Sequence, residues 1–419
     1  MTIVTPRVSR ASLSFILVTV TLDVLALGIV TPVLPSLVAG FVGGNLKSAA
    51  GIVGNFGVTW AVMQFIASPL LGAISDRFGR RPVILISNIG LGLDYVLIAL
   101  APTLTWIFVG RVISGIAAAS VTTAGAYIAD VTPPEKRAAS LGMLGGAFSL
   151  GFVLGPALGG ALGEVTARLP FWAAAALSLI NAGYELFVLP ESLPLQRRLS
   201  FCWRRANPIG ALASLLAHRD LPWLAASIFL DFLAYQVLPA VFVLYAMYRF
   251  DWSGLKIGLT LAAMALCTAL AQARLVRPIV EHFGERTALL SGLCCGALGL
   301  AVYGFASNSA LFWLGIPIMS LWGLAEPANQ ALMTSHVSEA QQGQLQGTVS
   351  ALRGLSGVIG PKLFTLIFAA SINGSGSRQF AGTPFLLSAL LLLIALALVW
   401  RHVGRANWAH RPFRAKSGG

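Results

Sequence analysis

The stretch GAISDRFGRRP, residues 72–82, connects two apolar runs that are each long enough to cross a lipid bilayer. Gly79 permits a tight turn there without a steric penalty at Cβ. Three arginines stand beside the single acid Asp76, a balance typical of loops that face the negatively charged cytoplasmic leaflet. We therefore interpret the stretch as a short cytoplasmic hairpin between two transmembrane helices.

The composition of the chain is that of a protein embedded in lipid. Of its 419 residues, 57% are hydrophobic and 10% are charged, whereas a soluble domain carries about 25% charged residues. So few charges cannot cover a folded surface with water-soluble side chains. The four cysteines have neither metal-ligand nor disulfide-framework spacing, and no histidine lies within an apolar run. We therefore expect no metal, no cofactor, no catalytic residue and no enzymatic activity.

Twelve apolar runs of about 20 residues match the thickness of a bilayer core. They cover residues 13–37, 50–73, 82–101, 103–128, 139–163, 169–189, 221–247, 254–276, 287–306, 309–333, 345–370 and 380–401. The chain is therefore predicted to be an all-α polytopic membrane protein.

The basic residues are distributed unevenly between the two sides of the predicted membrane. Of the 28 lysines and arginines, 20 lie in the termini and in the loops on the side of residues 72–82, five lie on the other side, and three lie within apolar runs. This bias predicts that both termini are cytoplasmic. It also accounts for the net charge of +13 without a nucleic-acid partner.

Sequence echoes indicate two duplicated halves. Gly79 of the hairpin has a counterpart in Gly284, and the Gly-Pro pair at 155–156 has one at 360–361, both 205 residues later. The LDVLA segment of the first run returns as LDFLA, 208 residues later. Pseudo-symmetric bundles of six helices are a transporter architecture, with the substrate bound between them. The predicted divisions are an N-terminal bundle 1–189, a cytoplasmic linker 190–220, a C-terminal bundle 221–402 and a basic cytoplasmic tail 403–419.

Charged residues within the apolar runs are candidate functional groups, because burial of a charge in lipid is costly. They are Asp23, Asp94, Arg111, Glu185, Asp231, Glu326, Arg353 and Lys362. Since no histidine shares these runs, we expect carboxyl groups to carry a coupled proton. The residues assigned to proton coupling are Asp23, Asp94, Arg111, Asp231 and Glu326.

Each of these residues also has a structural alternative. Asp23 and Asp94 could be packing acids, and Arg111 could belong to an ion pair of purely structural function. Arg353 and Lys362 are interpreted as partners that neutralise a membrane-embedded acid, with contact to an anionic substrate as the alternative. Glu185, near the end of its run, is expected to extend towards the membrane surface.

The fifth apolar run is rich in glycine and has the order G-x-x-x-G-P-x-x-G-G from residue 151 to residue 160. A proline kinks a helix, and glycines leave a smooth face on which a neighbour can slide or simply pack. This order resembles the helix-5 signature of antiporters in the major facilitator superfamily, which implies export by exchange. The residues concerned are Gly151, Gly155, Pro156, Gly159 and Gly160.

Several motifs resemble those of the tetracycline/proton antiporters of this superfamily. The hairpin at 72–82 resembles the loop between helices 2 and 3, and DY at 94–95, GAYIAD at 125–130 and QGQLQG at 342–347 are similar to further family motifs. The resemblance implies two six-helix bundles, alternating access, and export of a small-molecule drug in exchange for protons. It also implies a multi-pass protein of the bacterial inner membrane.

The resemblance gives individual positions expected roles. Asp23 and Asp94 match membrane-embedded acids important for transport, and Arg111 matches an arginine associated with proton coupling. The gating loop is expected to comprise Gly72, Asp76, Arg77, Gly79, Arg80 and Arg81, with Asp130 as partner of its arginine. The residues expected to line the substrate cavity are Gln64, Gln236, Gln330 and Arg353.

The C-terminal half departs from the family pattern. A helix-9 aspartate typical of the family corresponds here to Gly296, and Glu326, Arg353 and Lys362 stand where neutral residues are expected. Tetracycline-type efflux is the favoured interpretation, and the sequence leaves the substrate open. The alternatives are an exporter of a different, anionic compound and a proton-coupled uptake symporter.

Overall fold

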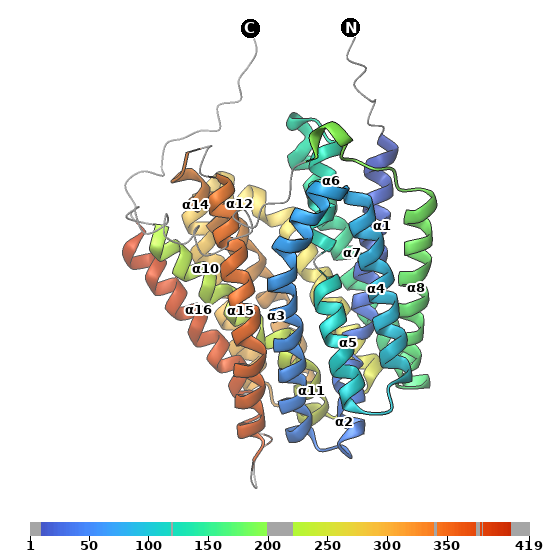
Figure 1. The fold of residues 1–419 in the computed structure, drawn as a ribbon. Helices are drawn as coiled ribbons and strands as arrows, with labels where there is room; N and C mark the ends of the chain where they lie inside the picture. The colour runs from blue at the N-terminus through green and yellow to red at the C-terminus, as the bar shows by residue number, and fades with distance from the viewer. Residues whose placement is uncertain are drawn as a thin grey trace, which may run out of the picture. The chain divides into compact units, whose positions relative to one another are not determined.

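The computed structural model describes residues 10–118, 120–198, 221–338, 342–373, 378 and 380–403 (Figure 1). The all-α prediction is confirmed, since no strand occurs in these ranges. Most of the predicted linker 190–220 and nearly all of the predicted tail 403–419 lie outside the described residues.

Eight of the described α-helices precede residue 190. They are α1 (Arg10–Val30), α2 (Leu34–Phe41), α3 (Leu46–Phe78), α4 (Arg80–Leu100), α5 (Leu104–Ala117), α6 (Ser120–Val131), α7 (Arg137–Val165) and α8 (Leu169–Phe187). Two 3-10 turns, η1 (Pro134–Lys136) and η2 (Leu195–Arg197), lie in the connections.

The described helices after residue 220 follow the same pattern of long apolar segments. They are α10 (Leu221–Tyr235), α11 (Val237–Phe250), α12 (Gly254–Phe305), α13 (Ser309–Ser320), α14 (Ala325–Ser335), α15 (Gln342–Ser371) and α16 (Thr383–His402). The 3-10 turn η4 (Leu321–Leu324) joins α13 to α14.

Every one of the twelve predicted apolar runs coincides with helical structure. Ten helical segments of the described chain are long and apolar enough to cross a membrane. The count is lower than twelve for two reasons. α12 is a 52-residue segment that joins the runs predicted at 254–276 and 287–306 across a break at Gly284, whose φ is 78°. α8, which corresponds to the run at 169–189, is not among the ten.

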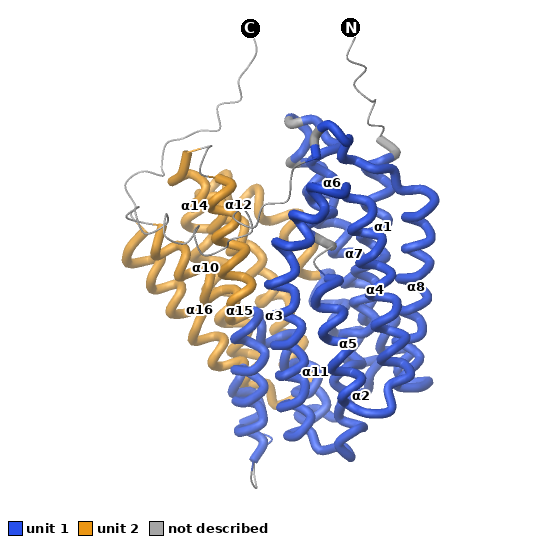
Figure 2. The backbone as a smooth tube through the Cα atoms, viewed as in Figure 1, with its two compact units in different colours: residues 1–207, 236–266, 357–384 blue, residues 208–235, 267–356, 385–419 orange. Residues whose placement is uncertain are grey.

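The chain forms two compact units. Unit 1 comprises residues 1–207, 236–266 and 357–384 (Figure 2, blue). Within it, α1 packs against α7 and α8, while α4 packs against α8 and α5. Gly28 of α1 and Gly155 of α7 allow two backbones to touch, since a Cβ on Gly155 would lie 2.6 Å from the Cα of Gly28.

Unit 2 comprises residues 208–235, 267–356 and 385–419 (Figure 2, orange). In this unit α10 packs on α14, and the hydroxyl of Ser388 on α16 donates to the carbonyl of Ala234 at 2.7 Å. Both α12 and α15 contribute residues to each unit. The predicted division into halves 1–189 and 221–402 therefore stays a prediction.

Candidate functional site

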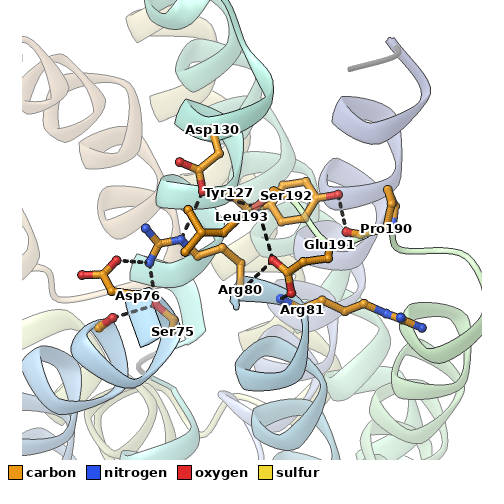
Figure 3. A network of polar contacts seen from close by, with 11 residues as sticks. Ser75, Asp76, Arg80, Arg81, Tyr127, Asp130, Pro190, Glu191, Ser192 and Leu193 are labelled. Carbon is orange, nitrogen blue, oxygen red and sulfur yellow. Dashed lines mark hydrogen bonds and ion pairs between the residues drawn. The ribbon is translucent and has the colours of Figure 1, made fainter. Parts of the chain in front are cut away.

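The predicted gating loop forms a polar network centred on Arg80, the first residue of α4 (Figure 3). The Arg80 guanidinium pairs with Asp76 at 2.6 Å, donates to Ser75 Oγ at 2.6 Å and, through Nε, pairs with Asp130 at 3.2 Å. Ser75 donates in turn to the carbonyl of Gly72 at 2.8 Å. The network joins the end of α3 and the start of α4 to the end of α6, so the expected pairing between the loop and Asp130 is present.

A glutamate outside the predicted loop completes this network. The carboxylate of Glu191, which follows α8, accepts the backbone N–H of Arg80 at 2.9 Å and that of Arg81 at 3.3 Å. It also accepts the N–H of Leu193 at 2.9 Å. The first N–H groups of a helix have no partner within the helix, and a negative charge there opposes the positive end of the helix dipole. Glu191 therefore caps α4.

Gly79 is required by this geometry for two reasons. Its φ is 109°, a conformation that L side chains rarely adopt. In addition, a Cβ at this position would lie 2.3 Å from a carboxylate oxygen of Glu191. Gly79 thus lets Glu191 reach the end of the helix. The remaining arginine of the loop, Arg77, is exposed and lies over the ring of Phe78 at 5.1 Å.

The segment 190–193 is also bound to α6. Ser192 donates its hydroxyl to Asp130 at 3.3 Å, and the buried Tyr127 donates its hydroxyl to the carbonyl of Pro190 at 2.8 Å. Figure 3 shows these groups converging from α3, α4, α6 and the chain that leaves α8. The gating loop is therefore held from two sides.

A buried ion pair joins α4 to α5. The guanidinium of Arg111 contacts Asp94 at 3.1 Å, and their side chains are 10% and 0% exposed. Gly110 makes room for the acid, because a Cβ there would lie 2.3 Å from the second Asp94 oxygen. Arg111 therefore belongs to an ion pair with a carboxylate.

A second polar cluster joins α1, α4 and α8. Asp23 is partly buried and accepts the side-chain amide N–H of Asn181 at 2.8 Å, and the same amide nitrogen donates to the carbonyl of Thr19 at 3.0 Å. One turn further along α8, Glu185 accepts from the amide of Asn88 at 2.5 Å. The prediction that Glu185 extends to the membrane surface is wrong. Its side chain is 0% exposed, because α1 and α4 cover this face of α8.

The C-terminal acids lie in unit 2. Asp231 of α10 is buried and accepts the indole N–H of Trp322 at 2.5 Å. Glu326 of α14 pairs with Arg353 of α15, and that guanidinium lies 4.4 Å from the ring centre of Phe232. The predicted internal pairing of Arg353 is thus present.

Lys362 differs from Arg353. Its ammonium group donates to the side-chain oxygen of Asn55 on α3 at 2.6 Å, and both residues belong to unit 1. In the described part of the chain this lysine has a neutral partner, so the expectation that it neutralises a membrane-embedded acid is wrong.

The four residues predicted to line the substrate cavity belong to different units. Gln64 on α3 and Gln236, between α10 and α11, are partly buried members of unit 1. Gln330 on α14 is a partly buried member of unit 2, and Arg353 is an exposed one. Their common role in a cavity stays a prediction.

The glycine-rich helix α7 has two contact faces within unit 1. Gly151, Gly155 and Gly159 face α1, and Gly160 faces the start of α12. Pro156 contacts both, since its ring lies at Gly28 of α1 and its carbonyl group lies at Gly258 of α12. A Cβ on Gly160 would lie 2.4 Å from the carbonyl oxygen of Gly254, so this contact excludes any side chain. Close packing is established on both faces, and sliding along them stays a prediction.

Some polar residues of these networks were missed by the sequence analysis. Asn88 and Asn181 are amides within apolar runs and are fully buried, and their polarity alone was a usable signal. Glu191 and Ser192 lie just beyond an apolar run, where polar residues are ordinary. No pattern in the sequence marks them as partners of the gating loop.

Comparisons with known proteins agree with the fold. The chain matches the Major Facilitator Superfamily model over residues 16–361 and 224–415. It is 38% identical to a class C tetracycline resistance protein from Escherichia coli over 396 residues, 94% of this chain and 97% of that protein. It is 35% identical to a class G tetracycline resistance protein from Vibrio anguillarum over 398 residues, 94% and 98% of the two chains.

Solved structures of transporters share the fold. The nucleoside transporter NupG superimposes with a TM-score of 0.77 at 13% identity, covering 94% of this chain and 99% of that one. The human organic anion transporter MFSD10 superimposes with a TM-score of 0.69 at 24% identity, covering 93% and 99%. This chain therefore belongs to the Major Facilitator Superfamily and, within it, to the family of the tetracycline resistance proteins.

Proposed function

We propose that this chain is a proton-coupled antiporter that exports a tetracycline-type small molecule by alternating access. The observation that carries the proposal is the similarity to tetracycline resistance proteins over 94% of the chain. A membrane transporter that confers resistance must lower the concentration of the drug inside the cell, and it does so by export. Export against a gradient requires an energy source, and buried carboxyl groups provide a means to couple it to protons.

The pair of Asp94 and Arg111 supports the coupling step. When Asp94 takes up a proton, Arg111 loses its counter-ion while 8% exposed. An uncompensated buried charge costs about 3–5 kcal/mol, so protonation favours a conformation in which Arg111 meets water or another anion. Protonation thus changes the relative free energies of the two conformations, and such a difference is required to shift the equilibrium between them. Asp23 differs from Asp94 in being partly exposed, so it can exchange its proton with water directly.

The network around Arg80 supports a gate on the cytoplasmic side. Four segments of unit 1 meet there through charge-assisted hydrogen bonds, which are stronger than neutral ones. Release of Arg80 from Asp76 and Asp130 would free the ends of α3, α4 and α6 together. We assign this network to the latch that holds one state of the transport cycle.

The charge bias supports a cytoplasmic location of both termini, and the similarity to bacterial tetracycline resistance proteins supports the inner membrane. In this arrangement the loop at 72–82 is cytoplasmic. The partners are the lipid bilayer, protons and the exported drug, and the positive net charge serves orientation rather than nucleic-acid binding. The two halves, 1–189 and 221–402, would provide the alternating access.

Everted membrane vesicles with an acidified interior test the proposal. Addition of tetracycline should release protons, which is followed by dequenching of a pH dye, and Asp23→Asn should abolish the response. Glu135→Gln, at an exposed glutamate in η1, is the matched control and should respond like the wild type. If the wild type shows no dequenching with tetracycline but responds to another compound, tetracycline is refuted as the substrate, whereas the antiporter mechanism is supported.

A second candidate function is the export of an anionic compound. The observation that favours it is Lys362, whose partner Asn55 is neutral and leaves the positive charge uncompensated among the described residues. The same vesicles distinguish the two functions with a panel of anionic and cationic drugs. An anion-specific response that is lost in Lys362→Gln would favour the second candidate.

A further inference from the structure

Glu185 lies in an environment that a carboxylate cannot tolerate. Its side chain is 0% exposed, and its Oε1 accepts from Asn88 while Oε2 has no hydrogen-bond partner in the described residues. No ion pair to Glu185 occurs among these residues. A buried carboxylate without a cation is so costly that the group takes up a proton instead. Glu185 is therefore a carboxylic acid in this state.

The groups around Glu185 link it to Asp23. Asn88 on α4 donates to Glu185, which lies one turn beyond Asn181 on α8. Asn181 binds Asp23 from the same helix as Glu185. Two amides thus hold two acids of different exposure together, since Asp23 is partly exposed and Glu185 is sealed.

The amide oxygens of Asn88 and Asn181 provide an independent sign of a mobile proton. Both residues are 0% exposed, and both side-chain oxygens have no donor in the described residues. A buried acceptor without a donor costs about 1–3 kcal/mol. The O–H of a protonated carboxyl group is the donor that such oxygens require. Because an amide has a donor and an acceptor end, rotation of Asn88 can match either protonation state of Glu185.

The remaining charges on the neighbouring helices are engaged elsewhere. Arg81 donates to the backbone carbonyl of Glu185 at 3.3 Å rather than to its carboxyl group, and Asp94 pairs with Arg111. The run 139–163 of α7 has no titratable side chain. The charged and titratable groups on the helices packed against α8 are Arg10 and Asp23 on α1, Arg80, Arg81, Asp94 and Tyr95 on α4, and Arg137 and Glu164 at the ends of α7.

We propose that Glu185 is a further proton-binding site of the N-terminal half, beside Asp23 and Asp94, and that it is coupled to Asp23 through Asn88 and Asn181. In loading, a proton from water adds to a carboxylate oxygen of this pair, forming one O–H bond and removing one negative charge. In unloading, the same O–H bond breaks and the proton returns to water, so no other reactant is needed. Two interacting acids titrate as a pair rather than singly.

Infrared difference spectroscopy of the purified protein in lipid tests this site without any substrate. Spectra recorded at acid and alkaline pH should show a C=O band of a protonated carboxyl group that disappears on alkalinisation. Glu185→Gln should lack this band, and Glu135→Gln should retain it. An unchanged carboxyl region in Glu185→Gln would overturn the proposal. If that variant does not fold, Asn88→Ala replaces it, and a band with unchanged frequency and midpoint pH would overturn the proposal equally.

Proton release on drug binding tests the role in transport, and this part rests on the proposed function. Tetracycline is added to the detergent-solubilised protein in weak buffer with a pH dye. Glu185→Gln should release fewer protons than the wild type, by up to one per protein, and should have a shifted pH profile of transport. An unchanged proton count and pH profile would contradict the role. Absence of drug binding to the wild type would refute the proposed substrate, while the infrared result still decides the proton site.

Discussion

Replacement of Glu191 by alanine is expected to loosen the first turn of α4 without unfolding the rest of the helix. The carboxylate accepts the N–H groups of Arg80 and Arg81 at 2.9 and 3.3 Å. The next residue, Pro82, has no N–H group. The N–H groups of Arg80 and Arg81 are therefore the donors of that turn that lack an acceptor within the helix. The variant leaves both without a protein acceptor.

The magnitude follows from the nature of these bonds. A hydrogen bond to a charged group contributes about 1.5–3 kcal/mol, and loss of a helix cap costs about 1 kcal/mol. Glu191 is only partly buried, so water can replace part of what is lost. We expect a net cost of about 2 kcal/mol for local opening, which corresponds to about 30-fold faster exchange of the two amide hydrogens.

Hydrogen–deuterium exchange measures this effect directly. The peptide that contains residues 80 and 81 should exchange faster in Glu191→Ala, with a smaller increase in Glu191→Gln, which keeps an acceptor oxygen but loses the charge. Peptides from the middle of α4 should be unaffected. Glu135→Ala, at an exposed position, is the control. An increase below about threefold at residues 80 and 81 would show that Glu191 does not cap the helix.

Two further substitutions test packing and charge. Asp94→Asn leaves Arg111 buried without a counter-ion and should destabilise the protein by about 3–5 kcal/mol, whereas the double variant with Arg111→Gln should recover most of the stability but not transport. Thermal unfolding in detergent measures the stability, and vesicle assays measure the transport. A double variant no more stable than Asp94→Asn alone would contradict the ion-pair argument. Gly155→Ala places a Cβ 2.6 Å from the backbone of α1 and should lower the stability of the protein by about 1–3 kcal/mol. Gly145→Ala, which has open space around its Cβ, should leave the stability unchanged. Equal unfolding temperatures of the two variants would disprove the close contact.

The membrane-spanning helices could be predicted from the sequence, because a helix needs about 20 consecutive apolar residues to cross the bilayer core. All twelve runs coincide with helix. The turn at Gly79 was also predictable, since a glycine among charged residues between two spans leaves few alternatives. Its positive φ has a counterpart at Gly284, as the echo between the two hairpins suggested.

Few partners of the polar groups were predicted: an acid for Arg353 followed from the cost of a buried charge, and the others followed from the resemblance. The pairing of Arg80 with Asp130 was expected on that basis and is present. Nothing comparable indicated that Lys362 binds Asn55, 307 residues away. The sequence shows which charges lie within the predicted helices, but it does not show which helix face each charge lies on or which group it contacts.

Glu185 illustrates the physical reason for this difference. Position along the helix placed it near the end of a span, where a long acidic side chain ordinarily reaches water. The packing of α1 and α4 over α8 removed that route, and α4 supplied the amide of Asn88 as a partner instead. Hydrophobic length is a local property that the sequence determines by itself. Burial, and with it the protonation and partners of each acid, depends on the neighbours that the tertiary structure provides.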